Sequence, residues 1–587
     1  MDSDKFRTLK ESIRVSHEKL KPFRESQMEA LRQYVGSNYS QNGSVDPILL
    51  NMIEMGVTTY LQNLVARRPQ VLMSTHVGQL LASANEAELA VNEALLQMGF
   101  EVELRTWVLS AMFSVGILKV GFEAVSYSSI DGEMLPKTRV FAEAIMLDDW
   151  VHDVSASKWT PQQVSFCGHK YKMPLEQAKS DPSFDQQVRG RLVSKENTLN
   201  ASHSTGERAD ELSREQAIND EEFLPQVELW DIWIPSMNLV VTFAEDADSP
   251  LREVQWRGPE EGPYILLGFN PVLGNIMPLP PVANWIDMHR LDNSLYTKLG
   301  EQASRQKTVN YAQAQSEEDA RRTINASDGD TIMVQNPQGV KEARFGGADQ
   351  ATLAFAMNAK SMTSYIMGNL DAIAGLGSAA DTLGQEQLIK NSSNDRLRSM
   401  QTAVVAATEK AVAAIVFWLF HNPLEQVNYT RKIPNTNLSL PATWPMQTDE
   451  WGRQFDARRG EFDQYKIRIS PYSMQDVTPT QRLDLLRRVW REDIVPLTQL
   501  GIQPDVPAYL RHVAKLADLP EIEEIVPSVQ TMLPPSIQTG DAPGKSPTSS
   551  REYVRKNVST GRTPEANDQQ MMQMLMSSGA GQSASAS

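Results

Sequence analysis

The segment from Asn284 to Asn422 constrains the fold most, because it contains long apolar stripes with helical spacing, separated by two different kinds of break. Intervals of three and four residues predict helices over about 284–314, 349–374 and 385–420. The stripes consist of Met288, Leu291, Leu295, Leu299 and Ala303; then Phe355, Ala359, Met362, Ile366, Leu370 and Ile373; then Leu397, Met400, Val404, Ala407, Ala411, Ile415 and Trp418.

The two breaks differ in character. The first, 315–348, holds a candidate strand, Thr331–Val334, between the turn signals Asp328-Gly329-Asp330 and Asn336-Pro337-Gln338-Gly339. The second begins with Gly375-Leu376-Gly377, and glycine commonly ends helices and frees the backbone. The sequence therefore predicts two long helices joined by a small turn-rich unit, then a glycine loop, then a longer helix.

Before this segment the pattern changes from helical to β-rich. Helices are predicted over 4–34, with an interruption at Pro22, over 47–66 and over about 84–114. The predicted strands are Ile117–Phe122, Val227–Ile234, Leu239–Phe243 and Tyr264–Phe269, with a polar insertion over about 175–222. Helices and sheets in separate blocks indicate the α+β class.

After the third long helix, a β-like stretch is predicted over about 427–469, followed by short helices over 480–490 and 506–516. Beyond Pro527 the sequence is rich in Pro, Ser, Thr, Gly and Gln, so we expect the last residues to be mostly disordered.

Composition excludes several classes of protein. The net charge of −17 argues against a protein that holds nucleic acid by neutralising phosphates. The single cysteine, Cys167, excludes an intramolecular disulfide framework. Met1–Lys10 alternates charges unlike a signal peptide, and the apolar stretch Ala411–Phe420 is too short to span a bilayer, so a soluble protein is expected.

Enzyme motifs are scarce. Gly375–Ala380 matches the GxGxxA dinucleotide pattern, but a helix, and not a strand, is predicted before it. Gly540–Ser546 is one residue short of a phosphate loop, and the eight histidines include no HExxH pair. We therefore expect no enzyme activity, no catalytic residue, no cofactor and no metal site.

Three arginine pairs and a basic part of the tail are candidates for contacts with phosphate. For Arg67-Arg68, Arg458-Arg459 and Arg487-Arg488 we favour solvated faces or salt bridges between subunits over phosphate contacts, because each pair lies among acids or apolar helix residues. For the tail, contact with DNA or a scaffold is the less favoured interpretation; its basic residues are Lys545, Arg551, Arg555, Lys556 and Arg562.

The order of these elements resembles the centre of the portal proteins of tailed bacteriophages, also called head-to-tail connectors or upper collars. Four local phrases are also similar to that family: Asn63–Val71, Gly116–Phe122, Leu147-Asp148-Asp149-Trp150 and Asp381-Thr382-Leu383-Gly384. The resemblance spans about Asn51 to Leu519 and leaves out the insertion at 176–222 and the tail.

The resemblance implies a portal fold with a wing, a long-helix stem, a small α/β clip and a helical crown. Its parts would be N-terminal helices and β-rich wing (1–283), descending stem helix (284–314), clip (315–348), ascending stem helix (349–374), tunnel loop (375–384), long wing helix and β-rich wing return (385–477), crown (478–526) and mostly disordered tail (527–587).

The function implied by the resemblance is structural. The chain would form a ring of about twelve subunits at the capsid vertex of the virion, assembled in the host cytoplasm. The ring would be the channel for packaging and ejection of double-stranded DNA. The terminase motor would dock on it first and head-completion or tail adaptor proteins later, beside major capsid and scaffold proteins, with no membrane involved. Another virion assembly protein, a scaffold or tail adaptor, is the alternative.

The resemblance also assigns a role to the glycine loop, which would project into the channel and touch DNA. Asp381 is its only charge, so the contact would be steric. An ordinary solvent-facing connection between helices is the alternative. The loop consists of Gly375, Leu376, Gly377, Ser378, Ala379, Ala380, Asp381, Thr382, Leu383 and Gly384.

Overall fold

The computed structural model describes most of the chain up to residue 474. The described residues are 1–36, 48–130, 133–193, 225–312, 317–326, 340–345, 347–373, 383–422, 426–432, 439–448, 454–470 and 473–474, with residues 331, 333, 487, 488 and 491. The chain divides into two compact units, Met1–Arg482 and Leu483–Ser587, and every helix and strand with described bounds lies in the first. That unit mixes helices and sheets, which confirms the expected α+β class.

The helices fall mainly at the two ends of this unit's sequence. They are α1 (Ser3–Val35), α2 (Met52–Leu64), α3 (Leu81–Gln97), α4 (Phe100–Phe113), α5 (Leu175–Ser180), α6 (Gln186–Arg189), α8 (Ile286–Ser304), α9 (Glu317–Asn325), α10 (Gln350–Ile366), α11 (Leu370–Ile373) and α12 (Leu383–His421). Short 3₁₀ turns occupy Gly78–Leu80, Leu147–Asp149, Pro235–Met237, Pro281–Asn284 and Phe462–Gln464.

The strands pair in antiparallel fashion throughout the described residues. They are β1 (Val71–Thr75), β2 (Gly116–Ile130), β3 (Glu133–Ile145), β4 (Trp150–His152), β5 (Cys167–Pro174), β6 (Gln226–Ile234), β7 (Leu239–Ala244), β8 (Arg252–Gln255), β9 (Tyr264–Leu267), β10 (Asn270–Val272), β11 (Asn275–Leu279), β12 (Lys307–Ala312), β13 (Val340–Phe345), β14 (Val427–Lys432), β15 (Ser439–Trp444), β16 (Met446–Thr448), β17 (Gln454–Asp456) and β18 (Tyr465–Ile469). The larger sheets have the orders β3-β2-β9 and β4-β5-β6-β7-β8; the others are two-stranded pairs, among them β1-β18, which joins the start of the unit to its end.

The largest core forms around α12 and confirms the predicted stripe of that helix. Leu397, Met400, Val404, Ala407, Ala411, Ile415 and Trp418 are all buried. They share a cluster with residues of α2, α3, α4 and β2. Because four helices and a sheet supply apolar faces to it, this core holds the N-terminal and C-terminal parts of the unit together.

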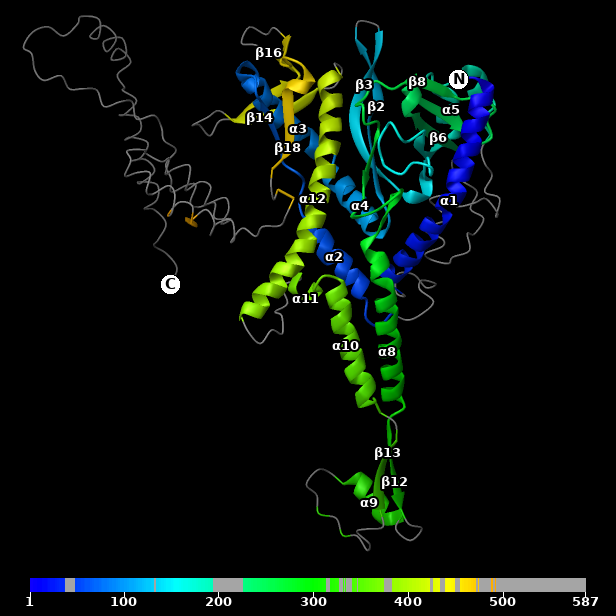
Figure 1. Cartoon of the computed structure of the whole chain (residues 1–587), viewed down its shortest axis with the longest axis vertical. Helices are drawn as coiled ribbons and strands as arrows, with labels where there is room; N and C mark the ends of the chain where they lie inside the picture. Colours follow the sequence, from blue (N-terminus) through cyan, green and yellow to red (C-terminus); the bar gives the residue numbers. More distant parts are fainter. Residues whose placement is uncertain are drawn as a thin grey trace, which may run out of the picture. The chain divides into compact units, whose positions relative to one another are not determined.

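The five-stranded sheet is covered by α1, which lies beside it in Figure 1. Phe6, Leu9 and Ile13 of the helix pack with a group of sheet residues that includes Trp230 and Phe243. Further along α1, Arg24 donates hydrogen bonds to the carbonyl oxygens of Leu147 and Trp150. Apolar packing and these polar contacts therefore fix α1 along much of its length.

The predicted interruption at Pro22 is wrong, since α1 continues through it. A proline removes one helical hydrogen bond and crowds the preceding turn. Buried Leu20 and the bonds of Arg24 hold the helix on both sides of that position, so tertiary contacts offset the local penalty. The helix predicted over 84–114 is instead divided at Gly99, whose φ of 65° ends α3 before α4 begins.

Boundaries in the central segment also differ from the prediction. The first long helix ends at Ser304 and not near Ala314, because Lys307–Ala312 forms β12 and pairs with β13. Thr308, Val309 and Tyr311 have the β-branched and aromatic side chains that strands favour. Of the strand predicted over 331–334, Thr331 and Met333 have no regular structure and the rest lies outside the described residues.

The second long helix also ends earlier than predicted. Gly368 and Asn369 have φ angles of 90° and 57°, a left-handed turn that separates α10 from the short α11. The third begins at Leu383 instead of about Gln385. Apart from Arg487, Arg488 and Arg491, the predicted crown and tail lie outside the described residues.

Candidate assembly surface

The helices α8 and α10 form an antiparallel pair, called here the α8–α10 hairpin, and Figure 1 shows them side by side. The two-stranded β12–β13 unit connects them. At this end of the hairpin, Gly347 and Asp349 donate backbone hydrogen bonds to the backbone and side-chain oxygens of Gln302. Asp349 also caps α10 by accepting from the Thr352 N–H. The hairpin is therefore closed by specific bonds where it meets β12–β13.

Small residues of α10 are turned inward. Ala356, Ala359 and Thr363 are buried and recur every three or four residues. The predicted stripe included Ala359 but placed Phe355 and Met362 beside it, and both of these are more than half exposed. Small side chains let two helices approach closely, so the buried face of α10 is rotated away from its large apolar residues.

The large apolar residues of α10 lie on two flanks of this buried face. At 3.6 residues per turn, Leu353 and Met357 fall on one flank, Phe355 and Met362 fall on the other, and Tyr365 lies on the outward face between them. Their side chains are 42, 62, 53, 56 and 72% exposed, respectively. One helix thus presents apolar side chains in two roughly opposite directions.

The face that α8 buries is largely polar. His289, Asp292 and Asn293 are buried, and so is Leu299. Of the predicted stripe, Leu291 is 37% exposed and Met288 and Leu295 are half-buried. Asn293 holds α8 to the segment before α2 by bonding both the N–H and the carbonyl oxygen of Leu50. The apolar flank of α8 therefore remains only partly covered within one chain.

A second set of bonds fixes the other end of α10. The Tyr60 hydroxyl of α2 donates to the Met367 carbonyl oxygen at 2.6 Å, and Arg396 of α12 donates to the Ile366 carbonyl oxygen at 2.5 Å. The last carbonyls of a helix have no partner within it, so these side chains satisfy them. The turn at Gly368 and Asn369 is consequently tied to both α2 and α12.

A buried charge network lies in the β-rich part. Asp231 accepts from Lys119 Nζ at 3.1 Å and from the Thr242 hydroxyl at 2.6 Å, with Arg252 Nη2 at 3.7 Å. Burial alone would raise the pKa of Asp231, but the nearby cations and the Thr242 bond outweigh it and lower this pKa to about 2. Asp231 is therefore ionised at neutral pH and joins the two larger sheets through Lys119 of β2.

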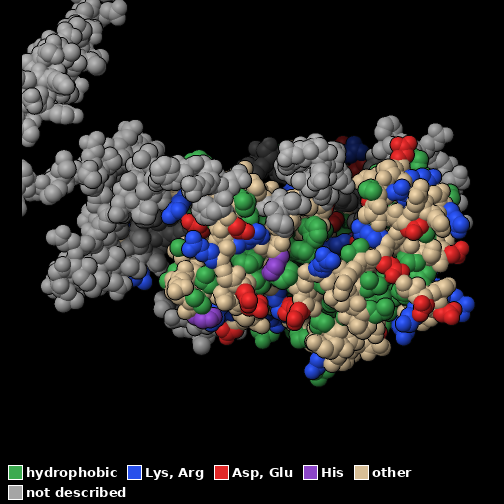
Figure 2. All heavy atoms as spheres, turned by 90° about the horizontal axis from the view of Figure 1, so that it is seen from above, with side chains coloured by type: hydrophobic (Ala, Val, Ile, Leu, Met, Phe, Trp, Pro, Cys, Tyr) green, Lys and Arg blue, Asp and Glu red, His purple; other side chains and the backbone are tan. Residues whose placement is uncertain are grey.

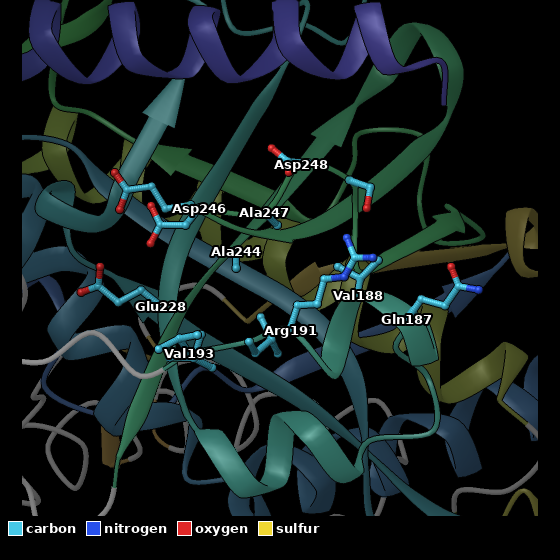
Figure 3. A pocket seen from close by; sticks show the side chains of 13 residues that line it. Gln187, Val188, Arg191, Val193, Glu228, Ala244, Asp246, Ala247 and Asp248 are labelled. Carbon is cyan, nitrogen blue, oxygen red and sulfur yellow. The ribbon is translucent and has the colours of Figure 1, made fainter.

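A pocket of about 330 Å³ lies next to α6 (Figure 3). In Figure 3, Glu228 and Asp246 lie on the left, Gln187 on the right and Arg191 between them. The described lining includes no histidine, cysteine or lysine; it consists of Gln187, Val188, Arg191, Leu192, Val193, Val227, Glu228, Ala244, Glu245, Asp246, Ala247, Asp248 and Ser249. Ser249 therefore has no histidine or lysine beside it among the described residues that line this pocket.

Charges of both signs are interspersed over the face seen in Figure 2. Arg458, one of the arginines considered as a phosphate contact, pairs with Asp456 and donates to the Phe420 carbonyl oxygen. Arg67 also has a partner within the chain. The guanidinium group of Arg458 is therefore already engaged.

The predicted channel-loop residues are mostly beyond what the structure describes. Gly375, Leu376, Gly377, Ser378, Ala379, Ala380, Asp381 and Thr382 lie outside the described residues, while Leu383 and Gly384 belong to the first turn of α12. The phrase that matches the dinucleotide pattern, Gly375–Ala380, and the one that resembles a phosphate loop, Gly540–Ser546, also fall outside them. No group of His, Cys, Asp or Glu in the described ranges has the arrangement of a metal site.

The segment Asp395–His421 of α12 is long enough and apolar enough to cross a membrane, by length and composition alone. It is longer than the apolar stretch Ala411–Phe420 that the sequence indicates. More than half of its most apolar window is buried. Packing in the main core therefore accounts for its apolar character.

No protein-family model matches this chain, and no curated protein sequence matches it.

Proposed function

We propose that this chain is the subunit of a portal ring, a structural protein that conducts double-stranded DNA at the capsid vertex of a tailed bacteriophage. The observation that carries the proposal is the pair of exposed apolar flanks on α10. A helix that lies between two neighbours in a ring needs an apolar flank toward each of them. Leu353 and Met357 supply one, and Phe355 and Met362 supply the other.

The geometry favours a ring over a two-fold dimer. A two-fold contact uses the same patch on both partners, whereas two different patches on opposite sides make a head-to-tail contact that closes or polymerises. The partly exposed Leu291 of α8 enlarges the surface available to a neighbour. The order of elements, α8, β12–β13, α10 and α12, supports the stem, clip and wing assignments of the portal resemblance.

In this proposal the ring performs no chemistry. The net charge of −17 gives its wall little attraction for phosphates, which suits a conduit through which DNA slides. The β12–β13 unit would be the docking site of the terminase motor and then of head-completion or tail adaptor proteins.

The molar mass of the purified full-length chain tests the proposal. Mass photometry across a concentration series should give one closed species of about twelve chains. A monomer at micromolar concentration, or a broad series of lengths that indicates open filaments, contradicts it.

A further inference from the structure

Asp292 is a fully buried carboxyl group at the contact between α8 and α10. Its Oδ2 lies 2.6 Å from the Thr363 hydroxyl oxygen of α10. Its Oδ1 has no hydrogen-bond partner among the described residues. Burying an ionised carboxylate with one oxygen that accepts no hydrogen bond costs free energy. The protonation state of Asp292 therefore affects the stability of the contact between α8 and α10.

The hydrogen count at Thr363 favours the neutral acid. The Thr363 hydroxyl oxygen is also 3.0 Å from the Ala359 carbonyl oxygen, yet a hydroxyl has a single hydrogen to donate. If Asp292 is protonated on Oδ2, it donates to Thr363, and Thr363 donates to Ala359. Both contacts are then hydrogen bonds at once, and no charge is buried.

The surrounding groups supply little compensation for a negative charge. His289, one turn earlier on α8, is fully buried, and burial together with Arg290 lowers its pKa to about 4, so it is neutral at pH 7. Arg290 pairs with Glu29 of α1. On α2, Glu54 accepts from Thr58, and the Tyr60 hydroxyl donates to Met367. Lys360 of α10 is a nearby cation, and its side chain is exposed.

These groups act on Asp292 in opposite directions. Burial raises the pKa of Asp292, and the Thr363 bond and Lys360 lower it by less. The pKa of Asp292 is therefore raised, in agreement with the protonated form that the single hydroxyl hydrogen of Thr363 favours.

We propose that Asp292 holds a proton in the closed α8–α10 hairpin and that loss of this proton loosens α10 from α8. The inference goes beyond the proposed function and does not depend on ring formation, since all of these groups lie within one chain. The stability of the contact between α8 and α10 then depends on pH.

The direction of the pH effect follows from linkage. The closed hairpin binds the Asp292 proton more tightly than the open one, so its stabilising effect is complete below the ordinary aspartate pKa and is lost as pH rises through the raised value. Between these two pKa values, the equilibrium constant for opening the hairpin, called here the opening constant, should rise by up to about tenfold per pH unit. His289 acts in the opposite sense, because its buried neutral form is favoured less as pH falls from 6.5 toward about 4.

Hydrogen exchange of α10 in the full-length protein tests whether the contact between α8 and α10 depends on pH through Asp292. Peptides covering 350–366 are followed between about pH 4 and pH 8 by mass spectrometry, with the intrinsic pH dependence of exchange divided out. Asp292→Asn keeps a side-chain donor toward Thr363 but has no proton to lose, and His289 titrates in both proteins. The ratio of the wild-type opening constant to that of the variant should therefore rise with pH, by up to about tenfold per pH unit below the raised pKa of Asp292. Asp287→Asn, at an exposed position of the same helix, is the control and should follow the wild type.

Equal pH dependence in the wild type and in Asp292→Asn would overturn the proposal. If Asp292→Asn does not fold, Lys360→Gln takes its place, since Lys360 is exposed. Loss of this cation, which lowers the pKa of Asp292, should extend the rise of the opening constant to higher pH. A pH profile identical to that of the wild type would equally refute the proposal.

Discussion

Replacing Phe355 with serine should weaken association between chains without weakening the fold of the single chain. A phenylalanine side chain buries about 150–250 Å² when fully covered. Since Phe355 is 53% exposed in one chain, about 100 Å² is left for a neighbour to cover. At about 25 cal/mol per Å², this surface is worth about 2.5 kcal/mol per contact, or roughly seventyfold in an association constant.

Mass photometry of Phe355→Ser over a dilution series measures this shift directly. Leu273→Ser is the matched control, because Leu273 is fully exposed on the turn between β10 and β11, away from the hairpin. Thermal unfolding of the monomeric fraction should be nearly unchanged for both variants. Rings of Phe355→Ser that persist to the same dilution as the wild type would refute the assignment of this flank to a subunit contact.

Three further outcomes follow from the fold and the proposal. Deleting Ser378–Asp381 should spare ring formation but lower packaging or retention of DNA in infected cells; normal full-length packaging would favour an ordinary connection between helices. Truncation after Pro527 should leave rings intact, because that sequence lacks apolar periodicity, and loss of soluble rings would show that the tail takes part in assembly. Asp231→Asn should lower the free energy of unfolding in urea by about 3 kcal/mol at pH 7, because it removes the buried carboxylate charge that pairs with the half-buried Lys119 and with Arg252. Since the pKa of Asp231 is lowered, this difference should shrink as pH falls from 3.8 toward about 2; a difference that does not change with pH would contradict the network's role.

The periodicity of α12 predicted its buried face correctly, whereas the same reasoning misplaced the face of α10. In α12 the stripe meets several neighbours that all need apolar contacts, so its residues from Leu397 to Trp418 are covered. Over most of its length α10 packs on α8, and close approach selects Ala356, Ala359 and Thr363 instead. A stripe shows that a helix has an apolar side, but the shape of the partner decides which residues enter the contact.

The polar contact between α8 and α10 could not be predicted from the spacing of apolar residues. His289, Asp292 and Asn293 are polar and fall outside the apolar stripe. In the structure Asp292 pairs with Thr363, and Asn293 pairs with Leu50 and contacts His289. Pro22 and Gly99 show the limits of local signals in another way. A proline was accommodated within α1 because both sides of it are anchored, while Gly99 ended a helix that the apolar pattern continued through.

Electron-microscope class averages of the purified full-length chain test the central claim most directly. The portal proposal predicts closed rings of about twelve subunits with a central channel wide enough for duplex DNA, and the α8–α10 hairpins lining it. Particles without a central opening, or two-fold dimers in which Phe355, Met362 and Tyr365 pair with their own copies, would contradict the proposal.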